Sequence, residues 1–297
     1  MKIITFFSEK GGVGKSSFSI MFSSWLKGHG VNVGLADFNE RVADYRRTEM
    51  RNRELLIKKN PDSGLKPYDV RDTWPIAKAT MGEINKIKRN TGSSTPYATW
   101  LEEQIRYGQL RGLDVVVCDF PGSLTGGEFF QVVSAQMMGL IVIPTERDAM
   151  TLRSTQKMHE LLSKGKWARH CIFINRARFD LRGYKSTYMK LGPKMTNEGY
   201  PMLPDMVQYS ERMLTIDKVD ILRSTFSFPD FEKPEFAGTK DLGLNNLFID
   251  ITRLLSTVPD YADTPPTDLS FVDGLQKTDD GKNFTGSAFP EFELKKD

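Results

Sequence analysis

One glycine-rich segment near the start of the chain constrains the fold more than any other feature. It follows the apolar residues 3–7, precedes a helical pattern, and reads Lys10-Gly11-Gly12-Val13-Gly14-Lys15-Ser16-Ser17. Glycines let the backbone close tightly so that successive N–H groups point at phosphate oxygens, and a helix N-terminus adds partial positive charge. In such a loop the lysine reaches the β- and γ-phosphates and the following hydroxyl holds Mg²⁺. We therefore predict a phosphate-binding loop, with these cofactor-binding residues: Gly11, Gly12, Val13, Gly14, Lys15, Ser16 and Ser17.

The rest of the chain has the pattern of an α/β protein. Apolar runs of four to six residues alternate with longer helical patterns, which favours a mostly parallel, doubly wound sheet flanked by helices. The first helical pattern places one apolar stripe along residues 18–26, and Gly28 and Gly30 end it. We expect one domain over residues 1–256, with an irregular insertion at about 60–100, where four prolines and a Gly-Ser-Ser-Thr stretch break the periodicity.

The loop departs from the ordinary pattern G-x-x-x-x-G-K-[ST], because Glu9 occupies the position of the first glycine and Lys10 is an additional lysine. The pattern K-G-G-x-G-K-[ST] resembles the deviant Walker A loop of the ParA/MinD family of P-loop ATPases. A chance glycine-rich turn before an amphipathic helix is the alternative. The resemblance implies that the cofactors are ATP and Mg²⁺. It also implies an ATP-dependent homodimer, in which Lys10 crosses to the partner's nucleotide.

Later segments extend the resemblance to about residue 255. Residues 31–39 end in Asp37-Phe38-Asn39, where the family usually has Asp-x-Asp. Residues 114–124 resemble the family's Walker B strand, an apolar run that is followed by the carboxylate of Asp119. Read from the residues alone, the latter is a buried strand with a capping aspartate. The resemblance implies a metal shell of Ser16, Asp37 and Asp119. It also implies that Asn175 contacts the adenine, that Pro204 packs on the base, and that the catalytic residues are Lys10, Lys15, Asp37 and Asn39.

Asn39 is the position where the chain leaves the family's hydrolytic pattern. The resemblance implies that the second aspartate helps to orient the attacking water, and an amide can neither accept a proton nor carry the negative charge. We therefore expect an ATPase whose hydrolysis is slow or depends on a partner. Glu40 and Asp44 are nearby carboxylates that could take over the role.

The charge is uneven along the chain. Residues 257–297 hold nine acidic residues and four lysines, a net charge of −5. Because the whole chain has a net charge of +3, residues 1–256 carry +8. With its prolines and weak periodicity, 257–297 is predicted to be a disordered tail. Two basic groups, at residues 46–59 and 164–185, are either solvated helix faces or phosphate-backbone contacts. The resemblance favours contacts, because it implies non-specific DNA binding and a stimulating ParB-like partner.

Two other classes remain as alternatives. A MinD-like positioning ATPase should end in a basic amphipathic helix, which the acidic, proline-containing C-terminus does not provide. A small-molecule ligase of the dethiobiotin-synthetase type would use the second lysine in carboxylation chemistry, and the basic body favours DNA over that reading.

Neither a membrane nor an iron–sulfur cluster is expected. No apolar run approaches the length of a membrane span and no signal-peptide pattern is present, which predicts a cytoplasmic protein with no membrane partner. Cys118 and Cys171 lie far apart in apolar runs, so we predict buried, inert thiols rather than the close cysteine pairs of iron–sulfur relatives.

Overall fold

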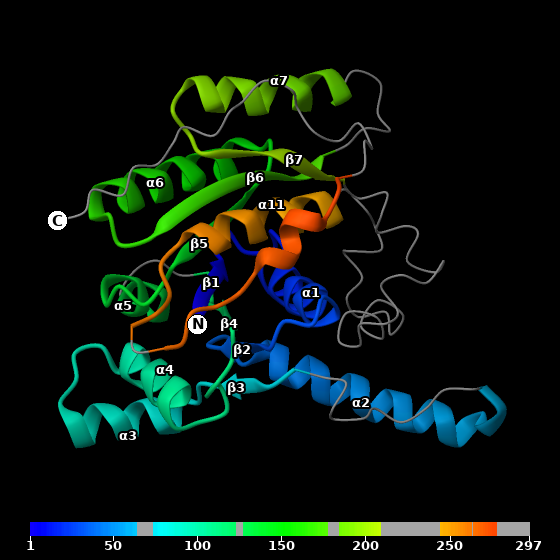
Figure 1. Cartoon of the computed structure of the whole chain (residues 1–297), viewed down its shortest axis with the longest axis vertical. Helices are drawn as coiled ribbons and strands as arrows, with labels where there is room; N and C mark the ends of the chain where they lie inside the picture. The colour runs from blue at the N-terminus through cyan, green and yellow to red at the C-terminus, as the bar shows by residue number, and fades with distance from the viewer. Residues whose placement is uncertain (64–73, 123–126, 178–183, 209–243, 263, 278–297) are drawn as a thin grey trace.

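A parallel sheet lies at the centre of the computed structural model, which describes residues 1–63, 74–122, 127–177, 184–208, 244–262 and 264–277 (Figure 1). Within these residues the sheet has seven strands in the order β3-β2-β4-β1-β5-β6-β7, and every pairing is parallel. The strands are β1 Lys2–Phe6, β2 Val33–Asp37, β3 Ile76–Lys78, β4 Val115–Asp119, β5 Leu140–Thr145, β6 Arg169–Ala177 and β7 Met202–Gln208.

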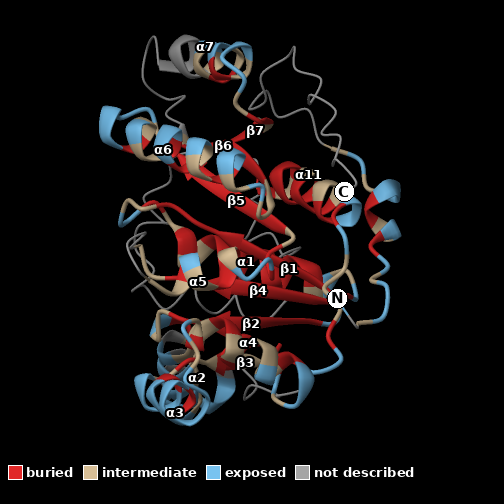
Figure 2. Cartoon of the chain, turned by 90° about the vertical axis from the view of Figure 1, so that its left-hand side faces the viewer, coloured by how far each residue is buried: buried red, intermediate tan, exposed pale blue. Residues whose placement is uncertain are grey.

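The central strands are buried along their whole length, as Figure 2 shows. This burial explains their near-continuous apolar sequences, because a parallel sheet that is covered on both faces has no solvent-facing side for polar residues. The helices that cover it are α1 Lys15–Gly28, α2 Arg41–Lys59, α3 Met81–Thr91, α4 Pro96–Arg106, α5 Glu128–Ser134, α6 Ala149–Gly165, α7 Tyr184–Asn197 and α11 Leu244–Thr257.

Two apolar cores lie on the two faces of the sheet. Helices α1 and α11 contribute to one core, with Phe22 and Phe248 in edge-to-face contact at 5.3 Å. Helices α3, α4, α5 and α6 contribute to the other core. In Figure 1, α1 and α11 lie to the right of the sheet and the helices of the other core lie to its left. Helix α2 extends away from the sheet.

Strand β1 is the point where the sheet winds in two directions. It pairs with β4 on one side and with β5 on the other, and the chain leaves its carboxyl end through the glycine-rich loop into α1. Ligands of open α/β sheets bind at this kind of switch point, outside the carboxyl ends of the strands. The predicted fold class, a doubly wound parallel sheet flanked by helices, is confirmed.

The prediction of an irregular insertion at 60–100 is wrong for residues 74–100. These residues contain β3, α3 and the start of α4. Thr80 and Glu83 form a capping box that starts α3, and Pro96 occupies the first turn of α4, where its missing N–H costs no hydrogen bond. The prolines and small polar residues therefore mark helix starts rather than the absence of structure. Residues 64–73 lie outside the described residues.

The predicted disordered tail also needs correction for residues 258–262 and 264–277. Val258, Leu269 and Val272 are buried against the core of α1 and α11. Lys277 Nζ lies 2.6 Å from Asp205 on β7 and 2.5 Å from Asp250 on α11. Three buried apolar side chains and one lysine between two aspartates hold this segment against the core, although its composition is polar. Residues 278–297 lie outside the described residues, and the division into domains remains a prediction.

The two cysteines lie inside the protein, as the sequence predicts. Cys118 and Cys171 are buried and belong to opposite cores of the sheet. None of the helices in the described part of the chain combines the length and the apolar character that a membrane crossing requires.

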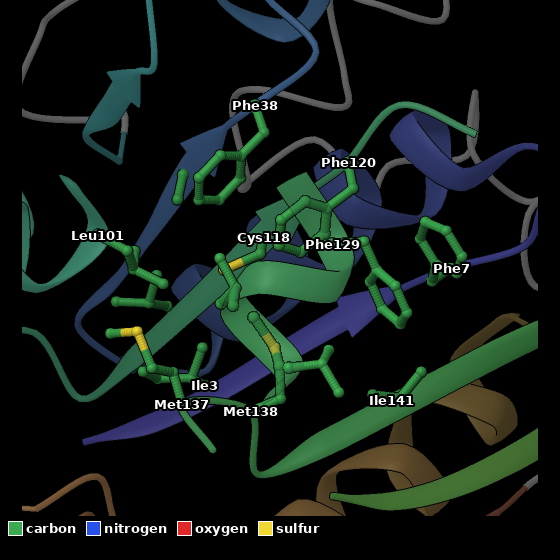
Figure 3. Close-up of a cluster of buried hydrophobic side chains, with 14 of the residues drawn as sticks. Ile3, Phe7, Phe38, Leu101, Cys118, Phe120, Phe129, Met137, Met138 and Ile141 are labelled. Atoms are coloured by element: carbon green, nitrogen blue, oxygen red, sulfur yellow. The ribbon is translucent and has the colours of Figure 1, made fainter. Parts of the chain in front are cut away.

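A row of aromatic rings lies directly beneath the carboxyl ends of β1, β2 and β4 (Figure 3). Phe7, Phe38 and Phe120 each follow the last residue of one of these strands by one position. Phe38 stacks on Phe120 with ring centroids 4.4 Å apart, and Phe7 stacks on Phe129 of α5 at 3.6 Å. Phe120 and Phe129 meet edge to face at 5.6 Å. The rings therefore tie three loops of the same sheet edge together.

Replacing the central ring should cost much of the stability. Phe120 is fully buried, so Phe120→Ala should lower the free energy of unfolding by about 3 to 5 kcal/mol, because it leaves a cavity among three other rings. Urea unfolding measures this change. Tyr107→Ala, at a side chain that is 80% exposed, should change the stability by less than about 0.5 kcal/mol. Equal losses in the two variants would contradict the role of the aromatic row.

Candidate functional site

The glycine-rich loop connects β1 to α1 with a backbone that only glycine adopts readily. Gly12 and Gly14 have φ of +78° and +88°, and Gly14 directly precedes the first residue of α1, Lys15. A Cβ atom at Gly14 would lie 3.2 Å from the Phe18 ring, so this glycine is also required for packing against the helix. The predicted strand, loop and helix are therefore all present, and the N-terminus of α1 points into the loop.

Lys15 is held inside this loop. It is 8% exposed, and its Nζ donates a hydrogen bond to the carbonyl oxygen of Lys10 at 3.0 Å. Burial lowers the pKa of Lys15, and the negative charge of Asp119 acts in the opposite direction. A Cβ atom at Gly122 would lie 3.0 Å from Lys15 Nζ, so the segment after β4 closes over the lysine without a side chain. A buried ammonium group with one carbonyl partner is suited to binding an anion.

Ser16 and Asp119 meet beside Lys15. Ser16 Oγ donates to Asp119 Oδ2 at 2.8 Å, and Asp119 Oδ1 is buried without a hydrogen-bond partner. Burial raises the pKa of Asp119 to about 7, while the hydrogen bond from Ser16 acts to lower it. A buried carboxylate oxygen that accepts no hydrogen bond and a neighbouring serine hydroxyl are suitable ligands for Mg²⁺, which prefers oxygen ligands. The sequence-predicted metal residues Ser16 and Asp119 are therefore brought together.

Asp37 lies next to Asp119 in the register of β2 and β4, but its oxygens are used locally. Oδ1 accepts the N–H of Asn39 at 3.1 Å and Oδ2 accepts the N–H of Ala43 at 2.9 Å, so the carboxylate caps the start of α2. Burial raises the pKa of Asp37, and these backbone N–H groups act to lower it. The metal and catalytic roles of Asp37 remain predictions.

Asn39 points toward the same site. The Asn39 amide is among the groups that act to lower the pKa of Asp119, so it lies near this carboxylate although no aligned hydrogen bond joins the two. The two carboxylates considered as substitutes are engaged elsewhere, because Glu40 and Asp44 lie 3.0 Å and 3.5 Å from the ammonium group of Lys78.

Lys10 is bound within its own chain. Its Nζ lies 2.8 Å from Asp148 Oδ2 and 2.8 Å from Thr151 Oγ1, both at the start of α6. Asp148 is also the N-cap of α6; although burial acts to raise its pKa, hydrogen bonds from Lys10 and Thr151 lower it to about 2. The lysine is one-third exposed, so it lies at the rim of the loop rather than inside it. Reaching a partner's nucleotide would require it to leave Asp148.

The end of β6 supplies two further contacts to the loop. Asn175 is 4% exposed and its Nδ2 donates to the carbonyl oxygen of Val13 at 3.0 Å. The next residue, Arg176, donates to the carbonyl oxygen of Gly12 and lies 3.1 Å from Glu146 Oε1. This role of Arg176 is not predicted from the sequence, where the residue belongs to the basic segment 164–185. An arginine directly after the predicted Asn175 is its only signal in the sequence.

The remaining predicted residues lie farther from the loop. Pro204 is inside β7, between the residues that pair with Ile172 and Ile174, whereas the loop lies at the carboxyl ends of the strands. Its contact with a base remains a prediction that this position does not favour. Asn175 turns its amide to the loop, and its contact with adenine likewise remains a prediction.

The two basic groups differ in their arrangement. Arg47, Arg51, Lys58 and Lys59 are exposed along α2, whereas Arg46 donates to the carbonyl oxygen of Trp74. In the second group Arg169 and Arg176 lie near opposite ends of β6. The usual rise of a strand places their Cα atoms about 23 Å apart. Arg178 and Arg182 lie outside the described residues, as does the side chain of Lys185. The described part of 164–185 therefore does not form one patch, which corrects that prediction.

Comparisons with known proteins agree with this geometry. The model of the ParA family, described as "NUBPL iron-transfer P-loop NTPase", matches residues 1–188. A comparison with curated proteins gives no match.

Several solved structures share the fold. A MinD cell division protein of Aquifex aeolicus has 15% identity and a TM-score of 0.56, over 85% of this chain and 97% of that chain. A Borrelia burgdorferi protein assigned to plasmid partition and bound to AMPPNP has 17% identity and a TM-score of 0.54, over 84% and 99%. An ATP complex of a McdA variant from Cyanothece has 15% identity and a TM-score of 0.51, over 86% and 96%. At these identities the likeness concerns the fold alone.

Proposed function

The chain belongs to the ParA family of P-loop NTPases, and from this membership and the geometry of its loop we propose that it is an ATPase that binds ATP with Mg²⁺. In this proposal it forms an ATP-dependent homodimer and binds DNA non-specifically, in plasmid or chromosome partition or in the maintenance or transfer of a mobile element. Two similar folds were solved with AMPPNP and with ATP, which supports the choice of nucleotide.

The observation that carries this proposal is the arrangement of Lys15, Ser16 and Asp119. Lys15 is buried beside the loop amides, and Ser16 donates to a carboxylate whose second oxygen has no donor. Lys15 and the loop amides would compensate the phosphate charge, which is the main requirement of phosphoryl transfer. Ser16 and Asp119 would hold Mg²⁺, which supplies further charge compensation at the phosphates when it is bound. A structural turn alone would not require a buried lysine and a buried aspartate with an unpaired oxygen.

Hydrolysis should be slow, because among the described residues the carboxylates near Asn39 are paired, except for Asp119, which this proposal assigns to Mg²⁺. Glu40 and Asp44 are paired with Lys78, and Asp37 caps α2. Asn39 can position a water molecule through its amide, but it cannot take up a proton from it. A stimulating partner, ParB-like in this proposal, would then supply or induce the missing arrangement.

Asn39→Asp should accelerate hydrolysis. The substitution is nearly isosteric and restores a carboxylate, so the rate of ATP hydrolysis should rise by one to two orders of magnitude, about 1.4 to 2.7 kcal/mol of barrier. A phosphate-release assay measures it, with and without DNA. Asn90→Asp, at an exposed position of α3, is the matched control and should leave the rate unchanged. A rate for Asn39→Asp no higher than that of the wild type would show that another group positions the water.

The proposed dimer depends on Lys10. Its charge is useful in trans only against a nucleotide that carries a γ-phosphate, so ATP rather than ADP should drive dimerisation. The lysine lies at the rim of the loop, and its present partners, Asp148 and Thr151, belong to the start of a single helix. Dimerisation would exchange this intramolecular ion pair for an intermolecular contact.

Lys10→Ala should abolish the ATP-dependent dimer and leave nucleotide binding by the monomer largely intact. Light scattering with ATP and with ADP measures the dimer fraction. Lys157→Ala is the matched control, because Lys157 is an exposed lysine of α6 that pairs with Glu9 of the same loop at 3.1 Å. Equal dimer fractions in the wild type and Lys10→Ala would refute the role of Lys10.

DNA binding is assigned to α2, on the exposed basic residues of that helix. Arg47 is 77% exposed at its side chain, and Arg51, Lys58 and Lys59 are exposed on the same projecting helix (Figure 1). Basic side chains that neutralise phosphates release counterions whatever the base sequence. A partition protein among the similar folds supports this reading, although a solvated helix face would carry the same charges.

The α2 assignment predicts a loss of salt-dependent binding. Arg47→Ala combined with Arg51→Ala should weaken binding to all DNA sequences equally and reduce the slope of log affinity against log salt by about one unit per lost contact. Fluorescence anisotropy with ATP present, over a range of salt concentrations, measures both effects. Lys86→Ala combined with Lys88→Ala on α3 removes the same charge from another exposed helix. Equal losses in the two double variants would argue against α2 as the contact surface.

Iron transfer, which the family description names, is not supported, because the chain has only two cysteines and its described part holds no cluster of possible metal ligands. Iron–sulfur clusters are held mainly by cysteine thiolates, and the two cysteines are buried in opposite cores of the sheet. A MinD-like positioning ATPase and a small-molecule ligase of the dethiobiotin-synthetase type stay as alternatives. Binding to DNA that requires ATP and falls with salt distinguishes the proposal from both.

A further inference from the structure

Arg176 has a backbone conformation that is unusual for a residue other than glycine. Its φ is +54°, in the left-handed region that non-glycine residues rarely adopt because it strains the backbone. The position also lies at an irregularity of the sheet. Between Ile174 and Ala177 strand β6 advances three residues while β7 advances two, from Met206 to Gln208, so β6 carries one extra residue here. Such a bulge re-aims a side chain, and bulges concentrate next to active sites.

The bulge directs two neighbouring side chains to the same loop. In a regular strand, successive side chains point to opposite faces. Here Asn175 donates to the carbonyl oxygen of Val13, and Arg176 donates to the carbonyl oxygen of Gly12. Arg176 is held from the other side by Glu146, which directly follows β5 and lies 3.1 Å from its guanidinium group. Because Glu146 Oε1 has no aligned hydrogen-bond donor, this contact is ionic rather than directional.

The carbonyl contacts determine where the loop amides point. In a planar trans peptide the C=O and the next N–H point in opposite directions. A donor that holds the carbonyl of Gly12 therefore orients the N–H of Val13, and a donor on the carbonyl of Val13 orients that of Gly14. Lys15 does the same for Gly11 through the carbonyl of Lys10. Glycine-rich backbone would otherwise rotate freely, and a rotated peptide would present its oxygen to the phosphate.

We propose that Arg176 is a positioning residue of the nucleotide site. Braced by Glu146, it holds the Gly12–Val13 peptide with its N–H toward the phosphates. This inference rests on the proposed ATP site and concerns how its loop is kept ready for binding. The left-handed backbone at Arg176 is retained because it allows two consecutive residues of β6 to fix two consecutive loop peptides. Arginine suits the task, because its planar guanidinium can face a carboxylate and a carbonyl at once, whereas a lysine ammonium cannot bridge them in this way.

Arg176→Gly separates this role from folding. Glycine adopts a positive φ without strain, which offsets the lost contacts to Gly12 and Glu146 and the greater freedom of the unfolded chain, so the variant should unfold close to the urea concentration of the wild type. Its affinity for ADP and for AMPPNP should fall by about tenfold, and by the same factor for both, because the loop amides contact the phosphates that the two share. Calorimetry with Mg²⁺ present measures both affinities. Lys166→Gly is the matched control, since Lys166 has a φ of +49° at the end of α6, away from the loop.

Two further variants distinguish the brace from a simple positive charge. Arg176→Lys keeps the charge and should still lose most of the affinity. Glu146→Gln removes a negative charge near a polyanion, so it should tighten binding if Arg176 acts only by its charge, and weaken binding if Glu146 braces Arg176. Wild-type affinity in Arg176→Lys together with tighter binding in Glu146→Gln would overturn the inference, as would equal losses in Lys166→Gly and Arg176→Gly.

Lys15→Ala separates failure of this inference from failure of the proposed function. Loss of nucleotide binding in Lys15→Ala, with wild-type affinity in Arg176→Gly and Glu146→Gln, would reject the brace and keep the ATP site. Unchanged nucleotide binding in Lys15→Ala would reject the ATP site itself and the inference that rests on it.

Discussion

The stacking of aromatic rings under the carboxyl ends of the central strands is the contact on which the site depends. Phe7, Phe38 and Phe120 come directly after β1, β2 and β4, and each is followed within three residues by a residue of the site or its rim. With Phe129 of α5 they form one buried row. Because protein cores are packed as densely as organic crystals, moving one ring displaces the loop above it. The row thus fixes Lys10, Asn39 and Gly122 relative to one another.

Above this row, the site combines a few strained or buried groups that the surrounding structure holds in place. Asp119 is buried with one unpaired oxygen, Lys15 is buried with one carbonyl partner, and Arg176 has a left-handed backbone. Each of these is unfavourable by itself. They converge on one loop at the switch point of the sheet, where a polyanion and a divalent cation would satisfy them together. This convergence, rather than any single residue, supports a nucleotide site.

The sequence predicted the sheet and the loop, because both depend on local features, whereas the shared site of Ser16 and Asp119 was implied only by the family resemblance. A run of apolar residues, a glycine pattern and a carboxylate at the end of a strand are visible without knowledge of the neighbours. It failed at residues 74–100, which were predicted to be an irregular insertion, and at residues 258–262 and 264–277, which were predicted to be disordered. Pro96 and Thr80 start helices there, and Lys277 joins segments that are 27 and 72 residues away in the chain. Contacts of that range leave no periodic pattern in the sequence.

The sequence by itself determined the succession of strand, glycine-rich loop and helix, because backbone conformation and hydrophobic period are local properties. Only the tertiary structure decided which side chains hold the loop. A bulge in β6 brings Asn175 and Arg176 to carbonyls more than 160 residues away, while Lys10 finds Asp148 across the site. Such contacts depend on the register of β6 against its neighbours and on one positive φ, and neither is encoded in the residue types of the segments that meet.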